Sequence, residues 1–145
     1  MRLTIFALFA LLFSVNTAIA DGHDKANAFG FALNVPAEHI ADVEEILASH
    51  MKFMQSTHSV TGDASTRLNS YSVIKGPVMV DPTDPSKGTT GAMMYILSEH
   101  YETPAGFAKH MKASTGWSDL PRMQEIMMKF GLVVYPGFHM QSMNR

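Results

Sequence analysis

The chain has 145 residues, with 11 Lys and Arg against 13 Asp and Glu, a formal net charge of −2 and no cysteine. This length predicts a single globular domain, and the weak charge excludes the basic surface that a nucleic-acid-binding protein needs. The lack of cysteine excludes disulfides, thiolate zinc sites and a cysteine nucleophile. Any chemistry must therefore come from other side chains or from a cofactor.

The first 20 residues have the pattern of a secretory signal peptide. Arg2 precedes an apolar run over residues 3–13, and the small residues Ala18 and Ala20 precede an abrupt polar segment. The run is too short to span a bilayer comfortably, although a retained membrane anchor is the alternative interpretation. We therefore expect an exported protein, periplasmic or extracellular, with a flexible N-terminus over residues 21–27 and no membrane attachment after cleavage.

The first half of the mature chain predicts a strand, a long helix and a second strand. Apolar side chains alternate over residues 28–35, and over residues 37–58 they recur with the period of an amphipathic helix. Residues 68–74 predict the second strand, which Gly76 and Pro77 should end or bend. Residues 81–91, rich in Asp, Pro, Thr and Gly, predict a loop.

The second half predicts a strand, two helices and a final strand. Residues 92–97 are apolar on both faces, Pro104 opens a helix, and Asp119 can cap the next one. The last strand covers residues 132–135 and can continue into 138–140. The order β-α-β-β-α-α-β predicts a ferredoxin-like α+β fold, in which helices cover one face of a four-stranded antiparallel sheet.

A monomer of this fold leaves the other face of its sheet uncovered. Strands that are apolar on both sides imply that a second copy covers this face, because soluble monomers rarely expose an apolar patch of that size. We therefore expect a homodimer.

One part of the sequence resembles a known family. Residues 98–110 read Ser-Glu-His-Tyr-Glu-Thr-Pro-Ala-Gly-Phe-Ala-Lys-His, and residues 69–73, Asn-Ser-Tyr-Ser-Val, resemble the second strand of the same family. Over residues 28–143 the chain is thereby similar to the antibiotic-biosynthesis-monooxygenase-like (ABM) domains of the dimeric α/β-barrel superfamily. This superfamily includes cofactor-free oxygenases of quinol-like aromatics, haem-degrading enzymes, isomerases and members with no assigned reaction. The long loops at 59–67 and 76–91, and the signal peptide, depart from the family pattern.

Two residues of that segment are candidates for catalysis. Glu99 lies at a strand end, where its carboxylate could act as an acid or a base, cap the next helix, or pair with Lys109 or Lys112. His110 shares a helix face with Phe107, and the resemblance implies a ligand cavity beside it. There it could accept or relay a proton from a phenolic substrate. The alternative is a core histidine bonded to a backbone carbonyl.

Five more residues are candidates for substrate binding. His50 lies within the apolar stripe of the first helix, where an imidazole needs a polar partner or a polar cavity. Tyr71 and Asn34, on predicted strands, could bind a substrate oxygen or be ordinary sheet residues. Phe107 would add to the apolar wall. Trp117, the only tryptophan, could cover a flat ligand or pack across the dimer interface.

The chain is rich in methionine, with 12 in all. The grouping of His139, Met140 and Met143 in an exported protein raises a copper or haem hypothesis, because thioethers favour Cu(I). Most methionines fall instead on predicted helix core faces or in strands, where a flexible thioether fills gaps or lines an apolar pocket. We therefore expect no metal and no cofactor, with copper or haem handling as the alternative.

The sequence thus predicts an exported homodimer that binds a small apolar or aromatic molecule and no nucleic acid. The function implied by the resemblance is cofactor-independent oxygenation of a quinol-like compound. His110 would be the proton acceptor, with Glu99 and Tyr71 orienting polar groups. A non-catalytic ligand-binding or stress-response dimer is the alternative.

Overall fold

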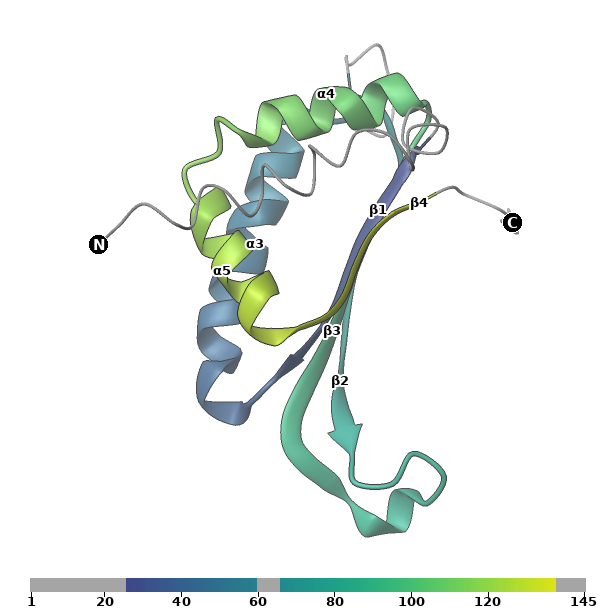
Figure 1. Cartoon of the computed structure of the whole chain (residues 1–145), viewed down its shortest axis with the longest axis vertical. Coiled ribbons are helices and arrows are strands. Elements are labelled where there is room, and N and C mark those ends of the chain that lie inside the picture. Colours follow the sequence, from purple (N-terminus) through teal and green to yellow (C-terminus); the bar gives the residue numbers. More distant parts are fainter. Residues whose placement is uncertain (1–25, 60–65, 138–145) are drawn as a thin grey trace, which may run out of the picture.

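In the computed structural model, which describes residues 26–59 and 66–137, helices pack against one face of a single sheet (Figure 1). The strands are β1 (Ala28–Val35), β2 (Leu68–Met79), β3 (Thr89–Tyr101) and β4 (Gly131–Gly137). The α-helices are α3 (Ile40–Thr57), α4 (Pro104–Ser114) and α5 (Leu120–Phe130), and the 3-10 helices are η1 (Ala37–His39) and η2 (Pro85–Lys87). The α+β class predicted from the sequence is confirmed.

The sheet is antiparallel throughout, with the strand order β2-β3-β1-β4. This arrangement is consistent with a ferredoxin-like fold. In the central strand β1 the predicted alternation is confirmed: Leu33 and Val35 are fully buried, while Asn34 between them is exposed. Successive side chains of a strand point to opposite faces, so the odd-numbered residues of β1 face the helices.

The main core lies between the sheet and helices α3 and α5. Val43 and Ile46 of α3 and Met123 of α5 pack with Leu33 of β1 and Leu97 of β3. Each fully buried side chain of this kind contributes roughly 1.5–3 kcal/mol relative to an exposed one. This core fixes the helices over the sheet and so positions the side chains that project between them.

The hairpin of β2 and β3 is longer than predicted. Of the two effects predicted for Gly76 and Pro77, the end of the second strand is wrong, because β2 continues to Met79. The register shift between Pro77 and Met79 agrees with the other, a local irregularity of the strand. Proline lacks an N–H donor and is tolerated on an edge strand such as β2. Within the predicted loop, η2 forms and β3 begins at Thr89, so the hairpin extends well beyond the helices (Figure 1).

The two later helices begin differently from one another. The Thr103 hydroxyl caps α4 by accepting a hydrogen bond from the backbone N–H of Gly106, at 3.0 Å. Asp119 occupies the N-cap position of α5 as predicted, but its side chain makes no capping hydrogen bond there. Its carboxylate instead accepts a hydrogen bond from the Ser49 hydroxyl of α3, which ties the start of α5 to α3.

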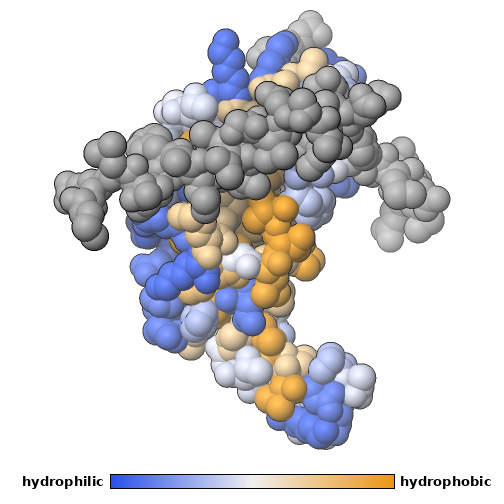
Figure 2. All heavy atoms as spheres, in the orientation of Figure 1, coloured by the Kyte–Doolittle hydropathy of each residue, from blue (hydrophilic) through white to orange (hydrophobic). Residues whose placement is uncertain are grey.

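The outer face of the sheet, opposite the helices, carries exposed apolar side chains. Ile74 lies opposite Ile96 in the β2–β3 register, and Val133 and Tyr135 lie opposite the outward-facing residues of β1. All four of these side chains are exposed. Figure 2 shows apolar side chains gathered over β4.

Several predictions concern residues outside the described ranges: the signal peptide over 1–20, residues 21–25 of the predicted N-terminal segment 21–27, the extension of the last strand beyond Gly137, and the group of His139, Met140 and Met143. Residues 26 and 27 are described, and the predicted flexibility does not fit them, because Ala26 is buried and Asn27 forms backbone hydrogen bonds to Gly137 and Tyr101. Among the helices of the described residues, none combines the length and apolar character that crossing a membrane requires.

Candidate functional site

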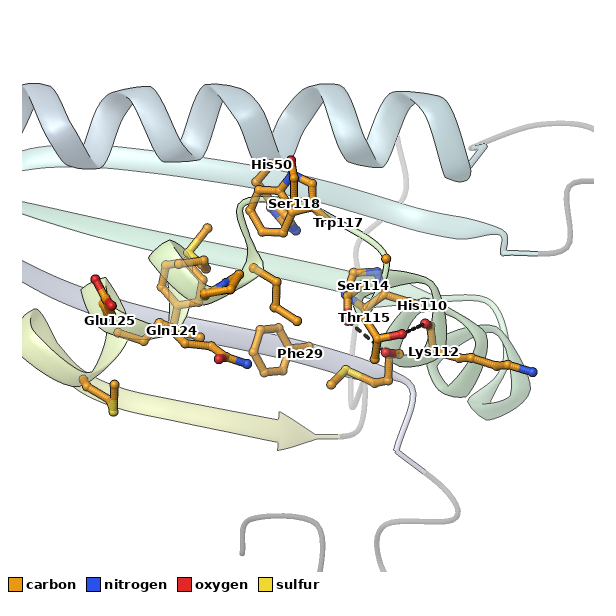
Figure 3. A pocket seen from close by; sticks show the side chains of 18 residues that line it. Phe29, His50, His110, Lys112, Ser114, Thr115, Trp117, Ser118, Gln124 and Glu125 are labelled. Carbon is orange, nitrogen blue, oxygen red and sulfur yellow. Dashed lines mark hydrogen bonds between the residues drawn. The ribbon is translucent and has the colours of Figure 1, made fainter. Parts of the chain in front are cut away.

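A pocket of about 850 Å³ lies between β1, α4 and α5 (Figure 3). Two imidazoles, those of His50 and His110, form part of its wall. Much of the remaining wall is apolar or thioether, with polar groups added by α4, α5 and their connection. The lining includes Phe29, Phe31, Met111, Lys112, Trp117, Leu120, Met123, Gln124, Glu125, Met127 and Met128.

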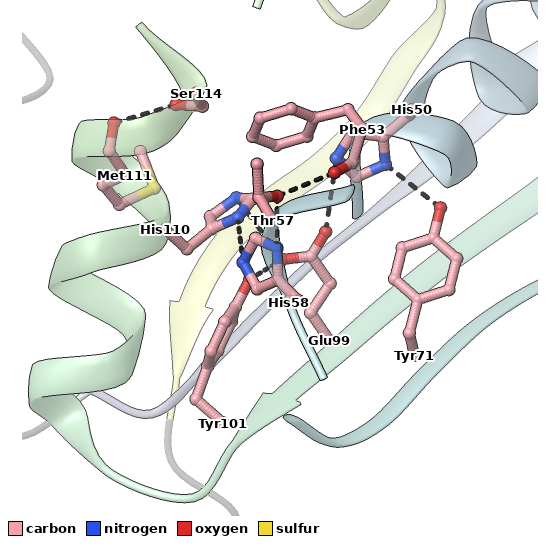
Figure 4. Close-up of polar contacts among 10 residues, drawn as sticks. All are labelled: His50, Phe53, Thr57, His58, Tyr71, Glu99, Tyr101, His110, Met111 and Ser114. Carbon is pink, nitrogen blue, oxygen red and sulfur yellow. Dashed lines mark hydrogen bonds and ion pairs between the residues drawn. The ribbon is translucent and has the colours of Figure 1, made fainter. Parts of the chain in front are cut away.

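Behind this wall a carboxylate meets the two imidazoles (Figure 4). Glu99 projects from β3 and is 0% exposed, while His50 of α3 and His110 of α4 are 6% and 4% exposed. Nε2 of His50 lies 3.6 Å from Oε1 of Glu99, and Nε2 of His110 lies 3.5 Å from Oε2. One potential ligand atom from each residue falls within 4.8 Å of the other two. Three elements far apart in sequence thus converge on one carboxylate.

Within the described part of the chain, only one oxygen of that carboxylate has a hydrogen-bond partner. The Tyr101 hydroxyl donates to Oε2 of Glu99 at 2.5 Å, because residues two apart on a strand share a face. Among the described residues Oε1 of Glu99 has no hydrogen-bond partner. A buried acceptor without a hydrogen-bond partner lowers the stability of the fold, and such groups often have a functional explanation.

A hydrogen-bond chain assigns the tautomer of His110. The Thr57 hydroxyl donates to the carbonyl of Phe53 at 2.7 Å, so its oxygen must accept from Nδ1–H of His58, also at 2.7 Å. Nε2 of His58 is then an acceptor, and Nδ1–H of His110 donates to it at 3.1 Å. His110 therefore presents an Nε2 lone pair, not an N–H, towards Glu99.

His50 is held by two aromatic residues. Its Nδ1 lies 3.0 Å from the Tyr71 hydroxyl, with which it shares a hydrogen bond. The indole of Trp117 is tilted over the imidazole, with ring centroids 5.2 Å apart. The predicted need of His50 for a polar partner is thereby confirmed.

Burial dominates the electrostatics of the cluster. It lowers the pKa of His50 to about 4 and the pKa of His110 to about 3, and the neighbouring His58 adds to both effects. Burial also raises the pKa of Glu99 to about 7, although the hydrogen bond from Tyr101 opposes this shift. At neutral pH both imidazoles are uncharged, so their contacts with Glu99 are not salt bridges. Of the two predicted catalytic groups, Glu99 has the pKa closer to that of a proton acceptor working at neutral pH.

Among the described residues, the two predicted catalytic side chains do not make the specific contacts considered as structural alternatives. Glu99 neither caps α4, which Thr103 does, nor reaches a lysine, because it is buried against the histidines. His110 bonds to the imidazole of His58 and not to a backbone carbonyl. Trp117 lines the pocket.

Two of the predicted substrate-binding residues lie elsewhere. Asn34 is exposed on the outer face of the sheet, away from the pocket. Phe107 is buried in a second core cluster, with its ring 6.4 Å from that of Phe29 and 5.6 Å from that of Tyr101. Both fall outside the pocket wall.

Two residues of the site were missed at the level of the sequence. His58 lies at the end of the apolar stripe predicted over residues 37–58, on the same side as His50. That shared side was a usable signal that the two imidazoles lie near one another. Tyr101 lies two residues after Glu99, so the strand period places the two side chains together.

Comparison of the chain with protein-family models, with curated proteins and with solved structures finds no match.

Proposed function

We propose that the protein binds a small apolar or aromatic molecule in this pocket, against the cluster of His50, Glu99 and His110. The observation that carries this proposal is the position of the cluster: both imidazoles belong to the pocket wall, and Glu99 lies directly behind them. Small-molecule pockets typically combine apolar walls with a few polar groups that fix the orientation of the ligand.

The side chains of the wall favour a flat ring. Trp117 stacks on Phe53, with ring centroids 5.5 Å apart and planes inclined by 21°, and it also covers His50. Phe29 faces the pocket from β1, and the thioether of Met123 can adapt to the outline of a ligand. The imidazoles would then meet a hydroxyl or carbonyl group of the ring.

The resemblance to ABM domains supports a reaction for such a ligand, the oxygenation of a quinol-like phenol by O2. A ring C–H carbon would become a carbonyl by gaining one oxygen atom, and the displaced hydrogen and the hydroxyl hydrogen would leave with the other oxygen as water. The phenol supplies all four electrons that reduce O2. A buried polar cluster beside an apolar wall suits this chemistry, because water is kept away from the reactive intermediate.

Quenching of Trp117 fluorescence by 1,4-naphthoquinone tests the binding step. Trp117 is the only tryptophan, and the chain has no thiol that a quinone could alkylate. We expect saturable quenching in the wild type. Met127→Lys places a charge in the wall and should weaken binding about tenfold or more, whereas Met51→Lys, on an exposed side of α3, should not. Quenching that never saturates, or that is equal in both variants, would contradict the proposal.

Oxygen consumption with 1-naphthol separates turnover from binding alone. Uptake of O2 that depends on the protein and is lost in His110→Gln would support the oxygenase. Saturable binding of naphthoquinone without any O2 uptake from a panel of naphthols would favour the non-catalytic alternative.

We further propose that a second copy covers the outer face of the sheet and completes a dimeric α/β barrel of two ferredoxin-like domains. The exposed Ile74, Ile96, Val133 and Tyr135 support this arrangement. The wild type should sediment as a dimer at micromolar concentration. Ile96→Lys should dissociate it, whereas Val80→Lys, at the end of the hairpin, should not. A wild-type monomer would remove the barrel from consideration.

Finally, we propose that the chain is exported after cleavage near Asp21, on the pattern of residues 1–20. Mass spectrometry of the exported material should show a chain that begins there. Exported protein that retains Arg2 would refute the cleavage.

A further inference from the structure

We infer that His50, Glu99 and His110 form a binding site for one divalent first-row transition-metal ion on the inner wall of the pocket. This inference rests on the proposed pocket and deepens its function, because it names the group that a ligand would meet. Two imidazoles and one carboxylate are a donor set of catalytic zinc sites and of non-haem iron sites.

The spacing of the donor atoms fits a shared ion better than it fits hydrogen bonds. The contacts of 3.5 and 3.6 Å from the two Nε2 atoms to Glu99 exceed the usual N–H···O range of about 2.7–3.2 Å. Two donors that each lie about 2.1 Å from a tetrahedral ion are about 3.4 Å apart. The two observed separations are close to that value, and each runs to a different oxygen of Glu99, so the carboxylate would hold the ion through both oxygens.

The hydrogen bonding of the donor atoms also favours a bound cation. The hydrogen-bond chain through His58 leaves a lone pair on Nε2 of His110, 3.5 Å from Oε2 of Glu99. An imidazole lone pair and a carboxylate oxygen repel one another unless a proton or a cation lies between them. Oε1 of Glu99, which faces His50, has no hydrogen-bond partner among the described residues. A bound cation would satisfy both of these groups.

Each donor also has an outer partner that orients it. Nδ1 of His110 bonds to His58, Nδ1 of His50 bonds to the Tyr71 hydroxyl, and Oε2 of Glu99 accepts from Tyr101. Metal-binding imidazoles and carboxylates are usually held in this way by a second set of hydrogen bonds. The three partners are His58, which directly follows α3, Tyr71 of β2 and Tyr101 of β3, so the arrangement is built by the fold and not by one segment.

Charge and access then indicate the class of ligand. Two neutral imidazoles and one carboxylate leave a divalent ion with a net charge of +1 in a buried site. An anionic oxygen from the pocket would balance this charge, and both imidazoles lie on the pocket wall. A hydroxylated aromatic that binds as its phenolate matches both the charge and the apolar surroundings, because a metal ion stabilises the deprotonated oxygen.

Titration of the chelator-treated protein with Co2+ tests the site, because Co2+ bound by nitrogen and oxygen donors absorbs visible light. We expect saturation at one Co2+ per chain. Glu99→Gln, which keeps the shape and the acceptor for Tyr101, and His110→Gln should each weaken binding by on the order of 100-fold or more. His39→Gln, at the partly exposed residue that precedes α3, is the matched control and should bind Co2+ as the wild type does.

Tyr71→Phe tests the outer partner of His50. It should weaken Co2+ binding by about 10- to 100-fold and change the absorption spectrum, because the imidazole loses the group that orients it. If Tyr71 had a purely structural role, its substitution would change the thermal stability and leave the spectrum of the bound ion unaltered.

If the variants of the metal-binding residues fail to fold, the wild type alone still tests the site. Zn2+ should raise its melting temperature by several degrees, and Mg2+ should not. The inference is overturned if millimolar Co2+ gives neither absorption nor a thermal shift, or if Co2+ binds equally well to the wild type and to folded Glu99→Gln. Naphthoquinone quenching is measured without metal, so a loss of either signal refutes its own proposal and not the other.

Discussion

Replacing Glu99 with glutamine should stabilise the metal-free protein at mildly alkaline pH. The amide has the same shape, and its oxygen can still accept the hydrogen bond from Tyr101. It carries no charge, however, whereas the carboxylate is completely buried and its Oε1 lacks a donor among the described residues. A buried carboxylate with incomplete compensation opposes folding once it ionises.

The size of the effect follows from the pKa of Glu99, which burial raises from 4.5 to about 7. A group whose pKa is raised on folding contributes fully to stability below its unfolded pKa, and this contribution is lost as the pH rises through the folded pKa. Each pKa unit corresponds to about 1.4 kcal/mol. Between pH 4.5 and pH 8 the wild type should therefore lose about 3 kcal/mol relative to the variant, or about 10 °C in melting temperature.

The other groups that face Glu99 are His50, His110 and Tyr101, and all three are common to both proteins. The lowered pKa values of the two histidines make both proteins less stable as the pH falls below about 6.5, so this effect largely cancels in the difference. The comparison of wild type and variant therefore isolates the carboxylate.

Urea unfolding with a chelator present, followed by circular dichroism at pH 5 and pH 8, measures the difference. The two proteins should be nearly equal at pH 5, and Glu99→Gln should be the more stable at pH 8. Glu102→Gln, in the turn after β3, is the control. Its carboxylate is half-exposed and pairs with Arg67 at 3.2 Å, so its replacement should not stabilise the protein at pH 8. A difference that is the same at both pH values would refute the reasoning, because the charge of Glu99 would then be compensated in the fold.

Two further predictions concern single contacts. Tyr101→Phe removes the one hydrogen bond to the Glu99 carboxylate and should lower the free energy of unfolding by about 2 kcal/mol, measured by urea denaturation at pH 8. Gly30→Ala would place a Cβ 2.6 Å from the Tyr135 hydroxyl and should cost about 1–3 kcal/mol, measured by thermal unfolding. Gly76→Ala meets nothing within 4 Å and should change stability by less than about 0.5 kcal/mol, so equal effects at the two glycines would contradict the packing argument.

Most elements of the fold could be predicted because their periods are regular. The first strand, over Ala28–Val35, and the helix that follows it match the prediction, since their apolar residues alternate or recur with clear periods. The extent of β2 could not be predicted. Whether Pro77 ends a strand depends on whether that strand lies at the sheet edge, and this is a property of the tertiary pairing.

The site was predicted in part, because local patterns select single residues whereas tertiary packing decides which of them meet. His50 and His110 could be selected as polar groups on apolar helix faces, which are unfavourable positions without a partner. Glu99 could be selected as a carboxylate at the end of a predicted strand, within the segment that resembles a known family. Their convergence depends on how α3, α4 and β3 pack, and no local pattern contains that information. The same limit explains Phe107: a helix face can be identified from the sequence, but whether it meets the core or the cavity cannot.

The pocket wall contains four methionines, Met111, Met123, Met127 and Met128, in a chain without cysteine. An oxidant released at this wall would meet thioethers and not thiols, so the damage would be methionine sulfoxide, which reductases reverse. A sulfoxide is polar, and each one formed would weaken the affinity of the wall for an apolar ligand. Oxidation of the methionines in this protein would therefore first cause a reversible loss of ligand affinity, before any loss of the fold.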